Sequence, residues 1–323
     1  MITSVLLFAV GLVLLIKGGD WFVDGATGIA KRFNLPDIVV GATVVSIGTT
    51  LPEVMVSTTG ALAGSGAMAY GNAIGSIICN TALIAAISIT CNPGPVNVKS
   101  MKTPAIFFFC SAALYCFASY VLGEFPRWMG FLMLSIFVVY MVLTVRNGMK
   151  NPDASAEEEE ESKPKALWQE LLLLVAGAAV IAVGADLLVE HGQIIALELG
   201  VPETVVALLF VALGTSLPEL VTTITSLKKG RASLGVGNVI GANVFNLVLV
   251  SGVAVSLAPF PVPCENFLLD TGMNMSLVFE IPVMLGVMSL MIFPAMATKK
   301  LGRWQGIALL IIYAAFCVCQ FVL

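Results

Sequence analysis

Charged residues are scarce in this chain. Asp, Glu, Lys and Arg make up 11% of the 323 residues, whereas an ordinary soluble domain carries about 25%. Hydrophobic residues make up 58%, and the mean hydropathy is +0.98. Such a chain lacks the polar residues needed to cover a surface that faces water. The composition therefore excludes a soluble globular protein and a disordered chain.

Histidine and an excess of basic residues are also missing. The one histidine is His191, so zinc sites and histidine catalysis have almost no side chains available. The net charge of −4 excludes a nucleic-acid binder, because phosphate binding requires many Lys and Arg residues. The seven cysteines are odd in number and show no metal-ligand spacing, so we interpret them as small apolar residues.

Long apolar stretches dominate what remains. A membrane-spanning helix needs about 20 apolar residues, and the chain has room for about ten. The first stretch reads as a span rather than a cleavable signal, because it lacks a basic leading region and a small-residue cleavage site. We therefore predict an all-α polytopic membrane protein with about ten transmembrane helices. The predicted spans cover about residues 3–30, 36–63, 68–90, 104–122, 127–146, 167–196, 202–227, 233–259, 276–296 and 304–322.

The loops between these spans sort by charge. Fourteen Lys and Arg residues fall on one side of the membrane and Arg127 alone falls on the other, while Lys17 lies inside the first span. Because basic residues collect in cytoplasmic loops, both termini are predicted outside the cell membrane. The acidic linker 147–166 is then cytoplasmic. Its run Glu157–Glu161 is typical of a solvated segment, with a regulatory calcium-binding role as the alternative.

An internal repeat divides the chain. A shift of 166 residues aligns Asp20–Leu83 with Asp186–Leu249 without a gap, and 21 of the 64 positions are identical. Each half, 1–146 and 167–323, has five predicted spans, so the halves enter the membrane from opposite sides. Inverted repeats of this kind are typical of secondary transporters, whose sites lie near the midplane where broken helices meet. A duplicated but inert bundle would not explain why the most similar segments are also the most polar.

The two most similar blocks carry the polar residues. Gly48–Glu53 reads G-T-T-L-P-E and Gly214–Glu219 reads G-T-S-L-P-E. A carboxylate within a span is costly unless it is paired or faces a cavity, so Glu53 and Glu219 are functional candidates. The proline before each Glu removes a helix hydrogen bond and frees the carbonyl four residues earlier. The same turns also carry the hydroxyls of Thr49, Thr50, Thr215 and Ser216.

The second pair of blocks supplies amides. Residues at a spacing of four form a stripe in each half, Asn72, Ser76 and Asn80 in one and Asn238, Ala242 and Asn246 in the other. Glycine pairs at 71 and 75 and at 237 and 241 favour close helix packing.

Oxygen atoms are the only candidate ligands in these blocks. Hard oxygen ligands suit Ca²⁺, Na⁺ or Mg²⁺, and a dry, flexible cage favours Ca²⁺ over Mg²⁺. Two carboxylates match one divalent cation. An empty site would bury two bare charges, and this cost would hinder its reorientation. Binding of Na⁺ or H⁺ on the return step would remove the cost. The charge of the site therefore predicts exchange rather than one-way transport.

At these residues the sequence resembles the cation/Ca²⁺ exchanger superfamily, specifically the prokaryotic sodium/calcium antiporters. The resemblance implies that Glu53 and Glu219 bind Ca²⁺ with the backbone carbonyls of Thr49 and Thr215. It also implies that Asn80 is a central ligand. The implied Na⁺ sites use the two carboxylates again, together with the carbonyls of Ser46 and Ala212 and the side chains of Thr50, Ser76, Thr215 and Ser216. Ala242 and Asn246 depart from the commoner Ser and Asp, and Asn246 argues against potassium co-transport. No cofactor is expected beyond the transported ions.

The leading hypothesis is a secondary active antiporter that exchanges Na⁺ for Ca²⁺ in the lipid bilayer. A Ca²⁺/H⁺ or other cation/proton exchanger on the same fold is the alternative, although the proton-coupled branch resembles G-N-A-x-E where this chain has G-T-[TS]-L-P-E. An intramembrane hydrolase lacks a nucleophile and base here, and a passive channel would need no coupled ion. We expect no enzyme activity and take a monomer as the working expectation.

Overall fold

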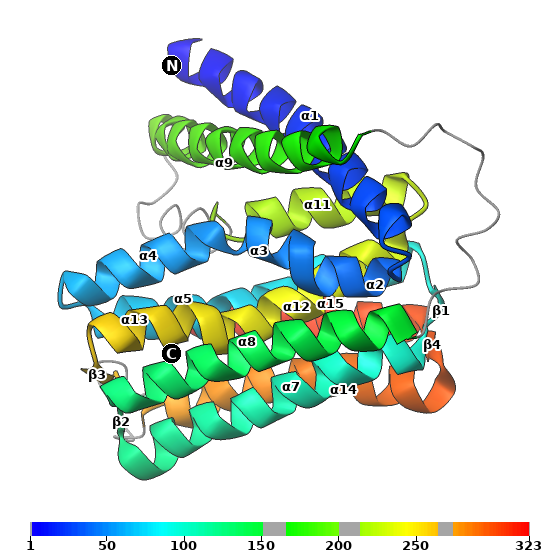
Figure 1. The fold of residues 1–323 in the computed structure, drawn as a ribbon. Helices are drawn as coiled ribbons and strands as arrows, with labels where there is room; N and C mark the ends of the chain where they lie inside the picture. Colours follow the sequence, from blue (N-terminus) through cyan, green and yellow to red (C-terminus); the bar gives the residue numbers. More distant parts are fainter. Residues whose placement is uncertain (1, 151–165, 200–213, 264–273, 323) are drawn as a thin grey trace.

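Helices account for nearly all of the fold. The structure is a computed structural model that describes residues 2–150, 166–199, 214–263 and 274–322 (Figure 1). Within these residues, four α-helices (α2, α5, α7 and α12) pass directly into π-helical segments, labelled η. In chain order the helices of the described residues are α1 (Ile2–Arg32), α2 (Asp37–Val40), η1 (Gly41–Val45), α3 (Ser46–Thr49), α4 (Leu51–Leu62), α5 (Gly66–Cys79), η2 (Asn80–Ala85), α6 (Ala86–Cys91), α7 (Val98–Phe117), η3 (Ala118–Leu122), α8 (Arg127–Lys150), α9 (Leu167–Glu198), α11 (Leu217–Lys228), α12 (Ala232–Phe245), η5 (Asn246–Val250), α13 (Ser251–Leu257), η7 (Ser276–Glu280), α14 (Ile281–Thr298) and α15 (Arg303–Val322).

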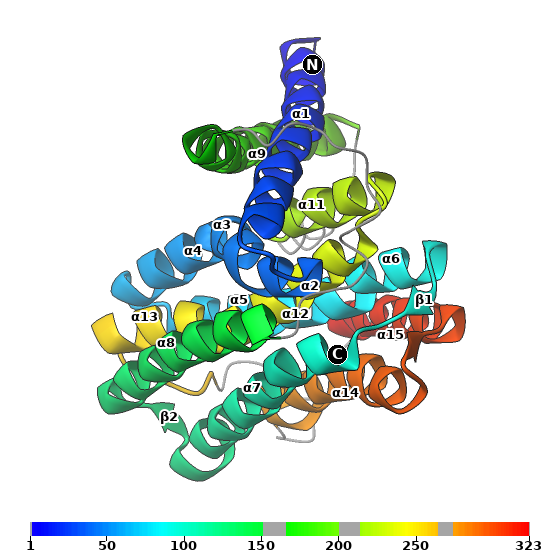
Figure 2. The same ribbon diagram turned by 45° about the vertical axis from the view of Figure 1, so that its right-hand side comes forward.

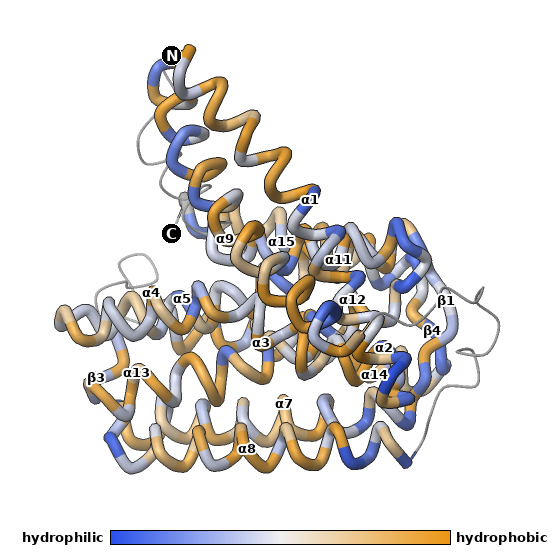
Figure 3. Tube along the Cα trace, turned by 45° about the horizontal axis from the view of Figure 1, so that its top comes forward, coloured by the Kyte–Doolittle hydropathy of each residue, from blue (hydrophilic) through white to orange (hydrophobic). Residues whose placement is uncertain are grey.

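The predicted all-α membrane architecture is confirmed. Within the described ranges, eight helices are long and apolar enough to cross a membrane. A ninth is the pair Asp37–Thr49 and Leu51–Leu62, which is bent by 46°. The remaining predicted span, about 202–227, is described only from residue 214 onward. Hydrophobic residues run along the helices, and hydrophilic ones gather mostly near helix ends (Figure 3).

Helices α1 and α9 form a crossed pair at one edge of the molecule (Figures 1 and 2). Their contact is close because glycines meet. A Cβ placed on Gly11 would lie 2.9 Å from the carbonyl oxygen of Gly184, and one on Gly184 would lie 2.9 Å from that of Gly11. Further along, Arg32 Nε and Glu170 Oε2 lie 3.0 Å apart. The first helix of each predicted half therefore packs on the first helix of the other.

Helix α12 lies at the centre of the main bundle, and its residues from Leu234 to Phe245 are all buried. It approaches α2 so closely that a Cβ on Gly237 would lie 2.2 Å from the carbonyl oxygen of Ile38. The expected close packing at glycines 237 and 241 is thus present. Around Gly71 and Gly75, no described atom lies within 4 Å of an added Cβ. The stretch that would pack there by the repeat falls in residues 200–213, outside the described ranges.

Two pairs of short strands connect loops that are distant in the sequence. Strand β1 (Gly94–Pro95) pairs with β4 (Lys300–Leu301), and β2 (Glu124–Phe125) pairs with β3 (Phe260–Pro261), both antiparallel. These four two-residue strands were not predicted, because the sequence was interpreted as entirely helical.

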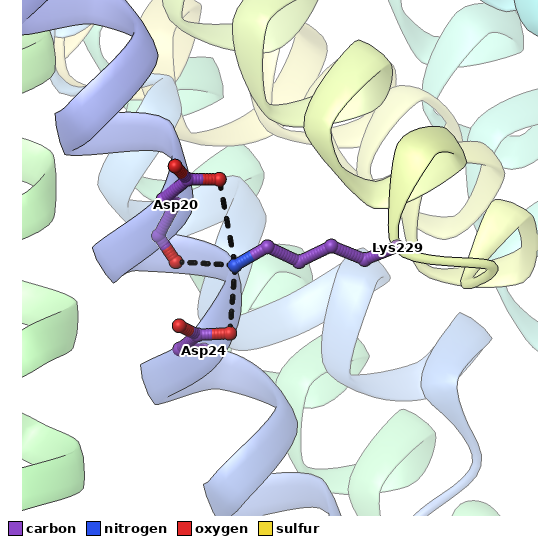
Figure 4. A network of polar contacts seen from close by, with 3 residues as sticks. All are labelled: Asp20, Asp24 and Lys229. Atoms are coloured by element: carbon purple, nitrogen blue, oxygen red, sulfur yellow. Dashed lines mark hydrogen bonds and ion pairs between the residues drawn. The ribbon is translucent and has the colours of Figure 1, made fainter.

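A lysine joins the α11–α12 loop to α1. Lys229 Nζ lies 2.7 Å from Asp24 Oδ1 and 3.5 Å from Asp20 Oδ1, and it donates to the backbone carbonyl of Asp20 (Figure 4). Arg231, which precedes α12, pairs with both carboxylate oxygens of Asp37 at 3.0 Å. These contacts link the loop between α11 and α12 to both α1 and α2.

We expect Gly237→Ala to destabilise the bundle. The added methyl group would collide with the backbone of α2, and overpacking typically costs about 1–3 kcal/mol. The melting temperature of the purified protein in detergent should fall by several degrees. Gly286→Ala in α14 is the matched control, because no described atom lies within 4 Å of the added Cβ. Equal melting temperatures for the two variants would show that α12 and α2 are not in this close contact.

Candidate cation site

The two Glu motifs adopt the same local structure. Proline stands at the start of α4 and of α11, each of which has 12 residues. The residue before each helix has nearly the same backbone angles, φ −85° and ψ 0° at Thr50 and φ −90° and ψ 3° at Ser216. Since proline has no N–H, the helix cannot continue its hydrogen bonds through this point. In the first motif, the span is accordingly broken into two helices, α3 and α4, at the proline.

Both carboxylates are completely buried. Glu53 and Glu219 have 0% exposure. In the part of the chain that the structure describes, neither oxygen of Glu53 has a hydrogen-bond partner, and Oε2 of Glu219 has none. The ion pairs of the described residues do not include either side chain. The two carboxylates are also close enough to interact electrostatically. Two buried acidic groups thus lie near each other, and neither forms an ion pair with a Lys or Arg of the described residues.

Hydrogen bonds connect the two motifs across the repeat. Thr50 Oγ1 donates to Glu219 Oε1 at 3.5 Å. Thr49 Oγ1 donates to Asn238 Oδ1 at 3.2 Å, and Ser46 Oγ donates to the backbone oxygen of Asn238 at 3.0 Å. These bonds run from the first half of the chain to the second, so the first motif is oriented by α12.

Asn72 makes the corresponding contacts for the second motif. Thr215 Oγ1 donates to Asn72 Oδ1 at 3.4 Å. The Asn72 amide also donates to the Glu53 carbonyl oxygen at 3.2 Å and to Ser57 Oγ at 2.8 Å. One side chain on α5 therefore contacts both Glu motifs. Asn72 and Asn238 were expected only as members of a polar stripe, and their bridging of the two halves was not predicted.

A π-helical segment begins at each of the two candidate amides. Segment η2 starts at Asn80 and η5 at Asn246, 166 residues later. A π turn shifts the following residues around the helix axis and is frequent at functional sites. Both amides have 0% exposure, and their side-chain nitrogen and oxygen atoms make no hydrogen bond within the described residues. Two amide oxygens are therefore available as ligands.

The other predicted site residues are also mostly buried. Ser46, Thr49, Thr50, Ser76 and Ser216 all have exposures of 4% or less, and Thr215 is partly buried. The hydroxyl of Ser216 has no partner in the described part of the chain. The carbonyl oxygen of Ser46 accepts the N–H of Thr50 at 3.0 Å, which leaves it one lone pair. Ala212 lies outside the described residues.

Three supporting contacts carried no signal in the sequence. Tyr140 on α8 donates to the carbonyl oxygen of Ala42 in η1 at 2.7 Å. Asn243 on α12 donates to Thr81 Oγ1 at 2.7 Å, and Ser251 Oγ donates to the Asn246 carbonyl oxygen at 2.9 Å. Each contact supports a π-helical segment or the turn where one begins. Of the three donors, only Asn243 lies within a motif block, and its repeat counterpart is an isoleucine.

This arrangement suits a hard cation. The assembled groups are carboxylate, amide, hydroxyl and carbonyl oxygens, which Ca²⁺ and Na⁺ prefer. Among the described residues, no group of three or more His, Cys, Asp or Glu side chains forms a transition-metal cluster. A buried acidic site lined by oxygen atoms in a helical multi-pass membrane protein is typical of a cation transporter rather than an enzyme.

Comparisons with known proteins give the family. The sequence profile described as "Sodium/calcium exchanger protein" matches residues 3–146 and 170–322. The membrane protein MJ0091 of Methanocaldococcus jannaschii is 34% identical over 95% of this chain and 94% of its own length. The sodium/calcium exchanger MaX1 of Methanosarcina acetivorans is 29% identical over 98% of each chain. The chain therefore belongs to the sodium/calcium exchanger family.

The fold agrees with this assignment. A solved structure of the sodium-calcium exchanger NCX_Mj, soaked with Na⁺ and Sr²⁺, superimposes with a TM-score of 0.79. The match covers 97% of each chain at 32% sequence identity. The predicted exchanger superfamily and the polytopic membrane fold are thus confirmed.

Replacing Thr50 by valine tests the contact between the two motifs. Valine keeps the shape of threonine but cannot donate to Glu219, and a hydrogen bond to a charged group contributes about 1.5–3 kcal/mol. We expect Thr50→Val to weaken ion exchange by about tenfold or more. Thr59→Val is the control, since Thr59 donates only to backbone oxygens of its own helix on an exposed face. Similar activity in both variants would remove Thr50 from the site.

Proposed function

We propose that this protein exchanges Na⁺ for Ca²⁺ across the cell membrane by alternating access, with Glu53 and Glu219 as the ion-binding carboxylates. The observation that carries the proposal is the burial of both carboxylates with three of their four oxygens unpartnered in the described residues. A carboxylate buried without a partner is strongly unfavourable. A bound cation removes that penalty, and a cation is the cargo that the family assignment supports.

Charge and ligand chemistry favour Ca²⁺ as one substrate. Two carboxylates balance one divalent cation, and the amides of Asn80 and Asn246 with the carbonyls of Thr49 and Thr215 add neutral oxygens. Mg²⁺ gives up its water reluctantly and requires strict octahedral geometry, so such a site favours Ca²⁺. Na⁺ would use the carboxylates again. Its other proposed ligands are the side chains of Thr50, Ser76, Thr215 and Ser216 and the carbonyls of Ser46 and Ala212.

Exchange follows from the cost of an empty site. Without a cation, the two buried carboxylates would have to cross between the two access states as bare charges. Reorientation then requires Ca²⁺ or its replacement ions in place, which couples the two fluxes. A Ca²⁺/H⁺ exchanger is the alternative, because protonating both carboxylates would also neutralise the site. All proposed ligands come from one chain, so we propose that a monomer is sufficient.

We propose two five-helix repeats of inverted topology, 1–146 and 167–323, joined by the linker 147–166. Helices α4 and α11 begin 166 residues apart, as do α5 and α12 and the π segments η2 and η5. The same offset that aligns the sequence thus aligns these boundaries. Inversion lets each half take the conformation of the other in turn, which is the basis of alternating access in such folds.

Loop pairing supports the proposed alternation of the spans. The loop with β1 and the loop with β4 are predicted on the same side, and they pair. The loops with β2 and β3 are predicted together on the other side, and they also pair. Since 14 of the 15 loop cations lie on the β1 and β4 side, we propose that this side is cytoplasmic and that both termini are outside. The cytoplasmic loop cations are Lys31, Arg32, Lys99, Lys102, Arg146, Lys150, Lys163, Lys165, Lys228, Lys229, Arg231, Lys299, Lys300 and Arg303.

Neutralising either carboxylate tests the proposal. Glu53→Gln or Glu219→Gln keeps the side-chain size and halves the site charge, so sodium-driven calcium exchange in proteoliposomes should fall to background. The control is Glu190→Gln, which removes an exposed carboxylate from α9. Near-normal exchange by a folded Gln variant would exclude that carboxylate from the ion site.

Cysteine labelling tests the orientation. On a background without the native cysteines, Ala156→Cys in the linker should react with an impermeant thiol reagent only after the membrane is opened. Glu124→Cys, at the exposed first residue of β2, should react in intact cells. The reverse pattern would overturn the proposed topology.

A further inference from the structure

The proposed exchange leaves one carboxylate within a membrane span unused. Glu280 ends η7 and lies within the apolar span Ser276–Thr298. Its side chain is partly buried, accepting from Ser276 Oγ at 2.8 Å and from Gln320 Nε2 at 3.2 Å. The ion pairs of the described residues do not include Glu280. Because a charge in a span is costly, an acidic group that only neutral donors contact indicates a function.

Three buried hydroxyls without hydrogen-bond partners in the described chain lie next to one another on the side of α5 that faces Ser276 and Glu280. Tyr70 on α5, Tyr115 on α7 and Ser119 in η3 have exposures of 2% or less, and their oxygens make no hydrogen bond in the described chain. The Tyr70 phenol is near enough to interact with Ser119, Ser276 and Glu280. The Tyr115 phenol interacts with Tyr70 and Glu280, and the two rings lie 5.7 Å apart. The Tyr70 hydroxyl therefore lies close to Ser119 and Ser276, although none of these approaches has the geometry of a hydrogen bond.

This cluster lies on a different face of α5 from the Glu53 site. Residues two apart on an α-helix point about 200° apart around its axis. Asn72 contacts the Glu53 carbonyl and Ser57, whereas Tyr70 packs its ring against Tyr115 and Phe125. Phe125 belongs to β2, so the cluster lies toward the β2 and β3 end of the molecule.

A bound cation accounts for these features together. A buried hydroxyl without a partner costs about 1–3 kcal/mol, and a water molecule could satisfy several at once. Water alone would leave the carboxylate charge uncompensated, whereas a cation neutralises it and coordinates the hydroxyl oxygens. A single carboxylate matches a single positive charge, and oxygen ligands suit Na⁺.

We propose that Glu280, Ser276, Tyr70 and Ser119 form a second site for a monovalent cation such as Na⁺, separate from the Glu53 and Glu219 site. This site goes beyond the proposed exchange and does not depend on it. It faces the β2 and β3 end, so a cation would reach it from that side of the membrane.

Thermal unfolding in a background without the central carboxylates tests the second site. The probe is NaCl, compared with choline chloride at equal ionic strength, on purified Glu53→Gln/Glu219→Gln protein. A ligand that binds only the folded state raises its stability, so Na⁺ should still raise the melting temperature. Adding Glu280→Gln should remove that shift or increase the half-maximal Na⁺ concentration at least ~10-fold. Adding Glu124→Gln, which removes an exposed carboxylate at the same end, should leave it unchanged.

Two smaller substitutions cover the case in which Glu280→Gln does not fold. In the same background, Tyr70→Phe and Ser276→Ala should each raise the half-maximal Na⁺ concentration several-fold. If Tyr70 only packs, removing its hydroxyl would leave the Na⁺ response unchanged. No Na⁺-specific shift in the double variant, or an equal shift after these substitutions, would overturn the second site. Neither result bears on the proposed exchange, since no transport is measured.

Discussion

The burial of two carboxylates that no Lys or Arg of the described residues pairs with is the constraint on which the rest of the site depends. Removing one partner from a buried ion pair typically costs about 3–5 kcal/mol, and here both Glu53 and Glu219 are completely buried. The fold holds them in place although their own electrostatics oppose folding. Under the proposed function, a bound cation would offset this cost, so the carboxylates that destabilise the empty site would be the ones that bind the ion.

Backbone breaks and close helix contacts position these carboxylates. Pro52 and Pro218 stand at the start of α4 and α11, and the residue before each helix has nearly the same backbone angles, so both motifs begin with the same turn. Helix α12 then approaches α2 through Gly237 and brings Asn238 to the first motif. Asn72 contacts residues of both motifs, and Asn238 joins α12 to the first motif. The two motifs are therefore connected through side chains on α5 and α12. This connection is what coupled binding of two different ions would require.

Sequence patterns predicted the class of fold and singled out the candidate site residues for definite physical reasons. Spans are recognisable because about 20 apolar residues are needed to cross a bilayer, and nine of the ten appear in the described residues when the bent pair is counted as one. Glu53 and Glu219 stood out because a carboxylate beside a proline is unusual in such a span. The identity of the ions, the ligand roles and the inverted arrangement remain predictions.

Other features depend on tertiary contacts that no local pattern encodes. The π segments at Asn80 and Asn246 follow stretches that read as ordinary helix. The bond from Tyr140 to Ala42 joins residues 98 positions apart, and neither residue is distinctive in its own segment. The small strands β1 to β4 form only because distant loops meet at each end of the bundle. Such contacts are set by packing of the whole chain rather than by residue spacing.

The most direct test of the account is the uptake of radiolabelled calcium into proteoliposomes loaded with Na⁺, with K⁺ or with neither. At equal pH inside and outside, the account predicts rapid uptake only into vesicles loaded with Na⁺, and loss of uptake when a sodium ionophore dissipates the gradient. Uptake that ignores internal Na⁺ and follows an imposed pH gradient would contradict sodium coupling and identify a calcium/proton exchanger.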